Sequence, residues 1–151
     1  MSAVICSLLL GCENPNSTAH DVDIDQPLND AARAELAPKA EHGDWTAARS
    51  LALDSFYSGR ANDWLTLKWT RAWATGNPAD GTNMLSLVLS RSCDLRDRDE
   101  AVALMRSRLA SPDFANLSPD LQDGERGSLE IAIQARRQGP TPTCNNLAGP
   151  T

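Results

Sequence analysis

The strongest constraint on the fold is the close spacing of helix start and stop signals between residues 28 and 139. Asn, Asp and Ser residues that can accept a hydrogen bond from a helical amide recur at short intervals, and Gly or Pro follows most of the stretches that they open. The expected helices cover residues 29–40, 45–58, 62–75, 78–93, 97–109 and 118–138, with a further turn of helix at 111–114.

Three local patterns refine these boundaries. Pro38 lies inside the first expected helix and predicts that this helix is short or broken. The run Asp97-Arg98-Asp99-Glu100 has the form of a capping box that opens the fifth helix. Ser111-Pro112 and Ser118-Pro119 each place Ser at a cap and Pro at the first helical position.

Residue usage favours helices over strands throughout the chain. Hydrophobic residues make up 41% and charged residues 23%, which is typical of a folded globular protein. Ala and Leu dominate, and no run alternates β-branched or aromatic residues with polar ones. We therefore predict an all-α body of five or six short helices in antiparallel hairpins, either a solenoid or a compact bundle.

A short internal echo favours the hairpin arrangement. Gly43-Asp44-Trp45 and Asn62-Asp63-Trp64 each open an expected helix, 19 residues apart. This spacing is about half of a 34-residue helical-hairpin repeat. Over residues 43–110 the body resembles tetratricopeptide-type or Sel1-type helical hairpins, and this resemblance implies a solenoid of such hairpins.

The charge distribution excludes an electrostatic nucleic-acid binder. Residues 13–44 carry eight acidic residues against Arg33 and Lys39, whereas the remaining residues carry twelve of each sign. Nucleic-acid binding relies on clustered Lys and Arg, which this chain lacks. We expect no nucleic-acid partner.

The first twelve residues have the pattern of a targeting sequence. A short apolar run, 3–10, ends in Leu9-Leu10-Gly11-Cys12 and is followed at once by a polar stretch. This sequence resembles the lipobox of bacterial lipoproteins. The resemblance implies that Leu9 and Leu10 are recognition positions, that Gly11 precedes the cleavage site, and that the Cys12 thiol is lipidated. The alternative is that residues 3–10 form a buried first strand or turn of helix.

The lipoprotein resemblance implies a domain order and a location. Residues 1–11 would be the signal peptide, 12–27 an acidic flexible tether, 28–139 the helical domain and 140–151 a Pro- and Asn-rich tail. The lipid would anchor the protein to the membrane on the periplasmic face of a bacterial envelope. Glu13 stands where the sorting pattern has Asp for inner-membrane retention, so we expect the outer membrane.

The cysteines fit the same compartment. If Cys6 leaves with the leader and Cys12 is lipidated, Cys93 and Cys144 remain as an even pair in an oxidising environment. We predict a disulfide between them that tethers the tail to the body. Two free thiols are the alternative.

Tryptophan supplies the candidate binding surface. Trp69 and Trp73 share the apolar face of the third expected helix, whereas Trp64 lies on another side with Lys68 and Arg71 at helical spacing. We predict that Trp69 and Trp73 are core residues. Trp64, Lys68 and Arg71 would form an exposed protein-binding patch, because Trp and Arg often anchor interfaces. The alternatives are that Trp64 also belongs to the core, or that it stacks on a sugar ring of peptidoglycan.

No motif for catalysis, metal binding or cofactor binding is present. The Asp residues at 21, 23 and 25 resemble the start of a calcium loop, but the Gly and Glu that such a loop requires are replaced by Gln26 and Ala32. Glu100, Glu125 and Glu130 are the candidate acids for a cell-wall hydrolase, and their contexts are those of ordinary helix surface.

These observations predict a non-catalytic envelope lipoprotein that binds another protein and needs no cofactor. A scaffold or assembly factor and an immunity protein against a toxin both fit this description. A peptidoglycan-binding or peptidoglycan-cleaving protein is the alternative class.

Overall fold

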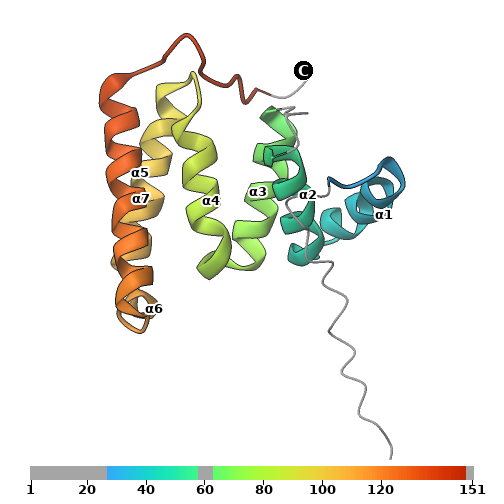
Figure 1. Cartoon of the computed structure of the whole chain (residues 1–151), viewed down its shortest axis with the longest axis horizontal. Helices are drawn as coiled ribbons and strands as arrows, with labels where there is room; N and C mark the ends of the chain where they lie inside the picture. Colours follow the sequence, from blue (N-terminus) through green and yellow to red (C-terminus); the bar gives the residue numbers. More distant parts are fainter. Residues whose placement is uncertain (1–26, 58–62, 149–151) are drawn as a thin grey trace, which may run out of the picture.

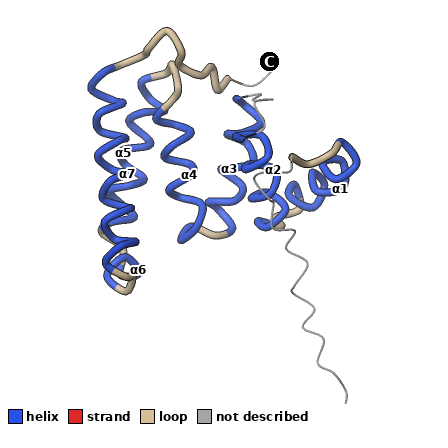
Figure 2. Tube along the Cα trace, viewed as in Figure 1, coloured by secondary structure: helices blue, strands red, loops and turns tan. Residues whose placement is uncertain are grey.

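A computed structural model describes residues 27–57 and 63–148, and this part of the chain is all-α. Its seven helices are α1 (Asp30–Glu41), α2 (Trp45–Tyr57), α3 (Asp63–Gly76), α4 (Pro78–Ser90), α5 (Leu95–Leu109), α6 (Pro112–Ala115) and α7 (Pro119–Gln138). Figure 2 shows helices joined by short loops, with no strand drawn in the described residues. The predicted fold class is confirmed, although the helices outnumber the expected five or six.

The helices α1 to α4 follow one another in a row, and α5 and α7 lie together at the far end of it (Figure 1). Each of α1 to α4 packs on the next helix, and α5 packs on α7. The long helix α7 also contacts α4. Chain-neighbour packing of this kind is what a series of helical hairpins produces.

The core has two connected parts. One lies among α1, α2 and α3 and contains Leu36, Leu51, Trp69 and Trp73. The other lies among α4, α5 and α7, and Met84 packs against both parts. The buried residues of the second part are Leu85, Val88, Leu89, Ala101, Ala132 and Leu147. Trp69 and Trp73 are therefore core residues, as predicted.

Close contact between α3 and α4 requires a glycine. Gly81 is buried, and a Cβ built on it would lie 2.5 Å from the Cα of Ala74. Only a residue without a side chain lets the two backbones approach this closely. Gly81 thereby fixes the α3–α4 hairpin that forms one wall of the cleft described below.

The predicted caps of the first two helices are confirmed. The Asn29 side chain accepts a hydrogen bond from the Ala32 amide at 2.8 Å. Asp44 accepts hydrogen bonds from the amides of Thr46 and Ala47, at 2.9 and 3.1 Å. These contacts satisfy amides that have no partner within the first turn of a helix.

Three boundary predictions were wrong. The helix α1 continues through Pro38, and the carbonyl that this proline leaves without an amide partner is that of Ala34, which is exposed and can bond to water. The helix α5 begins at Leu95 with Asp94 as its cap, and Asp97 instead accepts a hydrogen bond from the Ser92 hydroxyl at 2.5 Å. The helix α4 ends at Ser90, so Cys93 lies in the loop that follows it.

The C-terminal tail leaves the end of α7 and runs back across the ends of the neighbouring helices, past the α4–α5 loop (Figure 1). The Cys93 amide donates to the Asn145 carbonyl at 2.9 Å, and the Asn145 amide donates to the Arg91 carbonyl at 2.8 Å. Leu147 then enters the core and is only 7% exposed. The tail is thus an integral part of the fold up to this residue.

Candidate functional site

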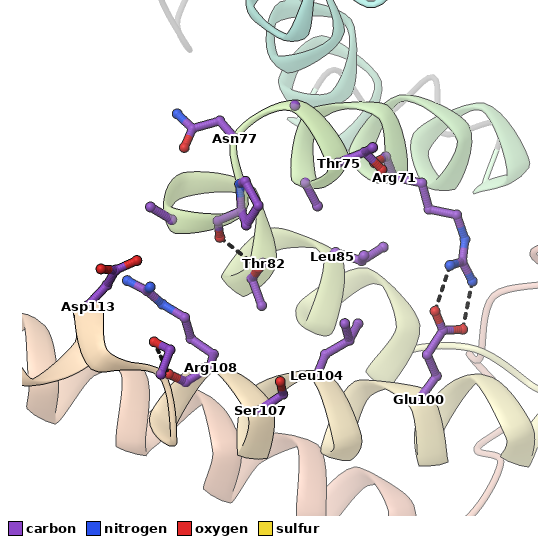
Figure 3. A pocket seen from close by; sticks show the side chains of 15 residues that line it. Arg71, Thr75, Asn77, Thr82, Leu85, Glu100, Leu104, Ser107, Arg108 and Asp113 are labelled. Atoms are coloured by element: carbon purple, nitrogen blue, oxygen red, sulfur yellow. Dashed lines mark hydrogen bonds and ion pairs between the residues drawn. The ribbon is translucent and has the colours of Figure 1, made fainter.

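An open cleft of about 660 Å³ lies between the α3–α4 hairpin and α5 (Figure 3). Its floor contains Leu85 from α4 and Leu104 from α5, with Ser107 beside them. Figure 3 places Arg71 and Glu100 at one end of the cleft, and Arg108 and Asp113 at the other. An apolar floor between charged ends suits a segment of protein that carries both apolar and polar groups.

The first end is closed by an ion pair between α3 and α5. The Arg71 guanidinium donates two hydrogen bonds to Glu100, one to each carboxylate oxygen, at 2.6 and 2.7 Å. These hydrogen bonds raise the pKa of Arg71 above its ordinary value. The pair is partly exposed, with side chains that are 43% and 36% accessible. It therefore contributes more to the geometry of the cleft than to overall stability.

The opposite end rests on a buried ion pair. Arg108 donates to both oxygens of Glu125 at 3.0–3.2 Å, and these side chains are 8% and 7% exposed. The Ser111 hydroxyl donates to the Arg108 carbonyl at 2.7 Å and holds the end of α5. The pair joins α5 to α7 and fixes the Arg108 wall of the cleft. Glu125 is thus a core residue, and the expectation that it lies on the helix surface was wrong.

The three residues of the predicted patch lie along one stripe of α3. Trp64 is half-buried, whereas Lys68 and Arg71 are exposed. The Lys68 ammonium donates to Glu41 of α1 at 2.7 Å and lies 4.2 Å from the centre of the Trp69 ring. Both cations of the patch therefore have acidic partners on neighbouring helices.

These two ion pairs define one face of the row. Lys68 links α3 to α1, and Arg71 links α3 to α5. We call this surface the α1–α3–α5 face, defined by Glu41, Lys68, Arg71 and Glu100. Thr75 continues the same helical stripe, and both Arg71 and Thr75 line the cleft. The predicted patch and the cleft are thus parts of one surface.

The predicted disulfide is confirmed: Cys93 and Cys144 are bonded, with their Cα atoms 5.0 Å apart. The bond joins the α4–α5 loop to the tail, as expected for a tether. The lipobox residues Leu9, Leu10, Gly11 and Cys12 and the acidic stretch that follows them lie outside the described residues.

The candidate acids for cell-wall hydrolysis occupy separate places. Glu100 is paired with Arg71, Glu125 is buried with Arg108, and Glu130 is exposed on α7. Within residues 27–57 and 63–148, no three His, Cys, Asp or Glu side chains come together as a metal-binding group. None of the described helices is both long enough and apolar enough to cross a membrane.

Comparison with known proteins gives no family for this chain. The chain matches no family model, no curated protein and no solved structure.

The cleft was not predicted from the sequence. Its two charged ends join residues that are 29 and 17 positions apart in the chain. The helical spacing of Trp64, Lys68 and Arg71 indicates the wall of the cleft that α3 forms. It does not predict the opposite wall, which α5 forms.

Proposed function

We propose that this chain is an envelope-anchored lipoprotein that acts as a non-catalytic protein-binding module. Lipid on Cys12 would hold it at the periplasmic face, at the outer membrane rather than the inner, and residues 13–27 would give the body reach. The lipobox-like sequence and the disulfide, which is typical of oxidising compartments, support this location.

The observation that carries the binding role is the continuity of the α3 stripe with the cleft. Trp64, Lys68, Arg71 and Thr75 follow one another at helical spacing, and the last two line the cleft. A partner segment that enters the cleft would also contact the exposed part of this stripe. Aromatic and Arg side chains beside a concave surface are the usual anchors of protein interfaces.

The ion pairs favour a protein partner over a small charged ligand. Arg71 and Glu100 neutralise each other, as do Lys68 and Glu41, so the face offers no strong net charge. It offers fixed donors and acceptors around apolar Leu85 and Leu104. A scaffold and a toxin-immunity protein would use such a preorganised surface in the same way.

Blocking the cleft tests the binding role. Ser107 lines the cleft and is exposed, so Ser107→Trp fills the cleft without disturbing the core. Ala34 is exposed on α1, outside the cleft lining, and Ala34→Trp is the matched control. We expect Ser107→Trp, and not Ala34→Trp, to lose the protein partner that the lipidated wild type captures from its native envelope. Equal capture by both variants would contradict the proposal.

The anchor is tested separately. Cys12→Ala should move the protein from the membrane pellet to the soluble periplasmic fraction, while Cys6→Ala should leave it in the pellet. Mass spectrometry of the mature N-terminus should find acyl chains on Cys12. An intact, unacylated N-terminus would refute the anchor and leave the cleft experiment valid.

A further inference from the structure

The C-terminal tail is attached to the helical body by few contacts. We call residues 140–148 the tail segment, and none of them carries a charged side chain. Within the described residues, two backbone hydrogen bonds join it to the α4–α5 loop, from the Cys93 amide to the Asn145 carbonyl and from the Asn145 amide to the Arg91 carbonyl. Leu147 adds one buried side chain, and the disulfide adds a covalent bond.

The noncovalent contacts are too few to order the tail segment by themselves. Fixing the backbone of a residue costs conformational entropy, and this cost accumulates over the whole segment. Two hydrogen bonds and one buried leucine return less free energy than this sum. The bond between Cys93 and Cys144 removes part of the cost, because it holds the segment beside the loop before any other contact forms. The docked state of the tail segment therefore depends on the disulfide.

The end of α7 is held separately, by Arg98 of α5. This side chain is buried, and its guanidinium donates to the carbonyls of Ala135 and Gly139 at 2.6 and 2.7 Å. It also donates to the Ser92 carbonyl at 2.6 Å, so the same residue fixes the α4–α5 loop. These contacts do not involve the disulfide. Release of the tail would therefore stop at Gly139, which ends α7 with a φ of 70°.

The disulfide lies on the outside of the fold. Cys93 is exposed in the α4–α5 loop, and Cys144 is half-buried, so the bond belongs to neither part of the core. Disulfides are opened by a thiolate that attacks one of the two sulfur atoms, and access to that sulfur sets the rate. Attack on Cys93 would release Cys144, the cysteine of the tail segment.

We propose that the Cys93–Cys144 disulfide is a redox switch that controls whether the tail segment is docked on the body. A thiolate of a dithiol attacks the Cys93 sulfur and forms a mixed disulfide, and Cys144 leaves as a thiolate that takes up a proton. The second thiol of the dithiol then displaces Cys93, which is also protonated. The protein gains two thiols, the dithiol becomes a disulfide, and the tail segment leaves the body.

The switch would change one surface of the protein and keep the helices in place. Leu147 belongs to the second part of the core, together with Leu89 and Ala132. When the tail segment leaves, the site of Leu147 becomes an apolar opening at the surface, which the oxidised protein keeps covered. This inference does not depend on the lipid anchor or on a partner in the α3–α5 cleft.

Hydrogen exchange of the full chain, measured by NMR with and without dithiothreitol, tests the proposal. Cys6→Ala and Cys12→Ala are included so that only Cys93 and Cys144 react. In the oxidised protein the amides of Cys93 and Asn145 should be protected, because both donate hydrogen bonds. Reduction should abolish this protection while the amides of α2 and α4 keep theirs, and reoxidation should restore it.

A matched variant reproduces the reduced state without a reagent. Cys93→Ser with Cys144→Ser should show an unprotected Asn145 amide from the start and should not respond to dithiothreitol. Protection of Asn145 that survives complete reduction would overturn the proposal, because the tail would then dock without its disulfide. Loss of protection throughout α2 and α4 would overturn it too, since the bond would then hold the whole fold. So would a disulfide that dithiothreitol opens only in denaturant.

Discussion

The Arg71 guanidinium and the Glu100 carboxylate meet in two hydrogen bonds, of 2.6 and 2.7 Å, across the space between α3 and α5. The pair is bidentate, a geometry that fixes orientation as well as distance. It closes one end of the cleft, and Leu85 of α4 lies on the floor between this pair and the opposite end. The pair therefore sets the width of the surface that a partner would contact.

Breaking this pair should affect binding more than folding. Because both side chains are more than a third exposed, Glu100→Gln should lower the free energy of unfolding by less than about 1 kcal/mol. Partner capture should fall, since Arg71 would lose its fixed position. Urea denaturation and capture assays measure the two effects. Asp123→Asn, which breaks the exposed pair with Arg126 on α7, is the control that should leave capture intact.

Breaking the buried pair of Arg108 and Glu125 should, in contrast, affect folding stability strongly. Arg108→Met leaves the Glu125 carboxylate buried without its partner and should destabilise the protein by about 3–5 kcal/mol. Adding Glu125→Leu removes the uncompensated charge and should recover most of this loss. Chemical denaturation of the single and double variants measures both values. A double variant no more stable than Arg108→Met would contradict the account.

The tail should depend on its disulfide. The bridge spans 51 residues of sequence, and Cys93→Ser with Cys144→Ser should cost about 4 kcal/mol by chain entropy. In the oxidised protein, Leu147→Ala should cost about 2–3 kcal/mol, because Leu147 is buried. In the disulfide-free protein the same change should cost much less, since the tail is no longer held in place. Thermal melts of the four proteins test this coupling, and additive losses would contradict it.

The Lys68–Glu41 pair should be sensitive to acid. The hydrogen bond from Lys68 holds the pKa of Glu41 below its ordinary value of 4.5. A carboxylate whose pKa is lowered by folding stabilises the folded state above its ordinary pKa, and this contribution is lost as the pH falls through the lowered value. NMR titration should give a higher Glu41 pKa in Lys68→Met than in the wild type. Identical values would show that the pair does not form in solution.

The sequence predicted the starts of α1 and α2 well because each of these helices carries its own capping residue. Asn29 and Asp44 cap α1 and α2 as expected, and Trp69 and Trp73 are buried on the face that the helical spacing indicated. These features depend on residues within one turn of helix. The local sequence pattern is therefore sufficient to predict these caps and the buried face of α3.

The site could not be predicted in the same way because it depends on contacts between helices. Glu125 has the sequence context of a surface residue and is buried only because α5 brings Arg108 to it. The partner of Arg71 lies 29 residues away, and several acidic residues were equally plausible candidates. The sequence spacing of α3 indicated one wall of the cleft, and packing supplied the rest.

Photo-crosslinking in the native envelope tests the central claim most directly. A photoreactive residue at Thr75, which lines the cleft and is exposed, should give a discrete adduct with a protein partner. The adduct should disappear when Ser107→Trp fills the cleft, and the same photoreactive residue at Ala34 should give none. An adduct that persists with Ser107→Trp, or one that forms equally from Ala34, would contradict a partner bound in the α3–α5 cleft.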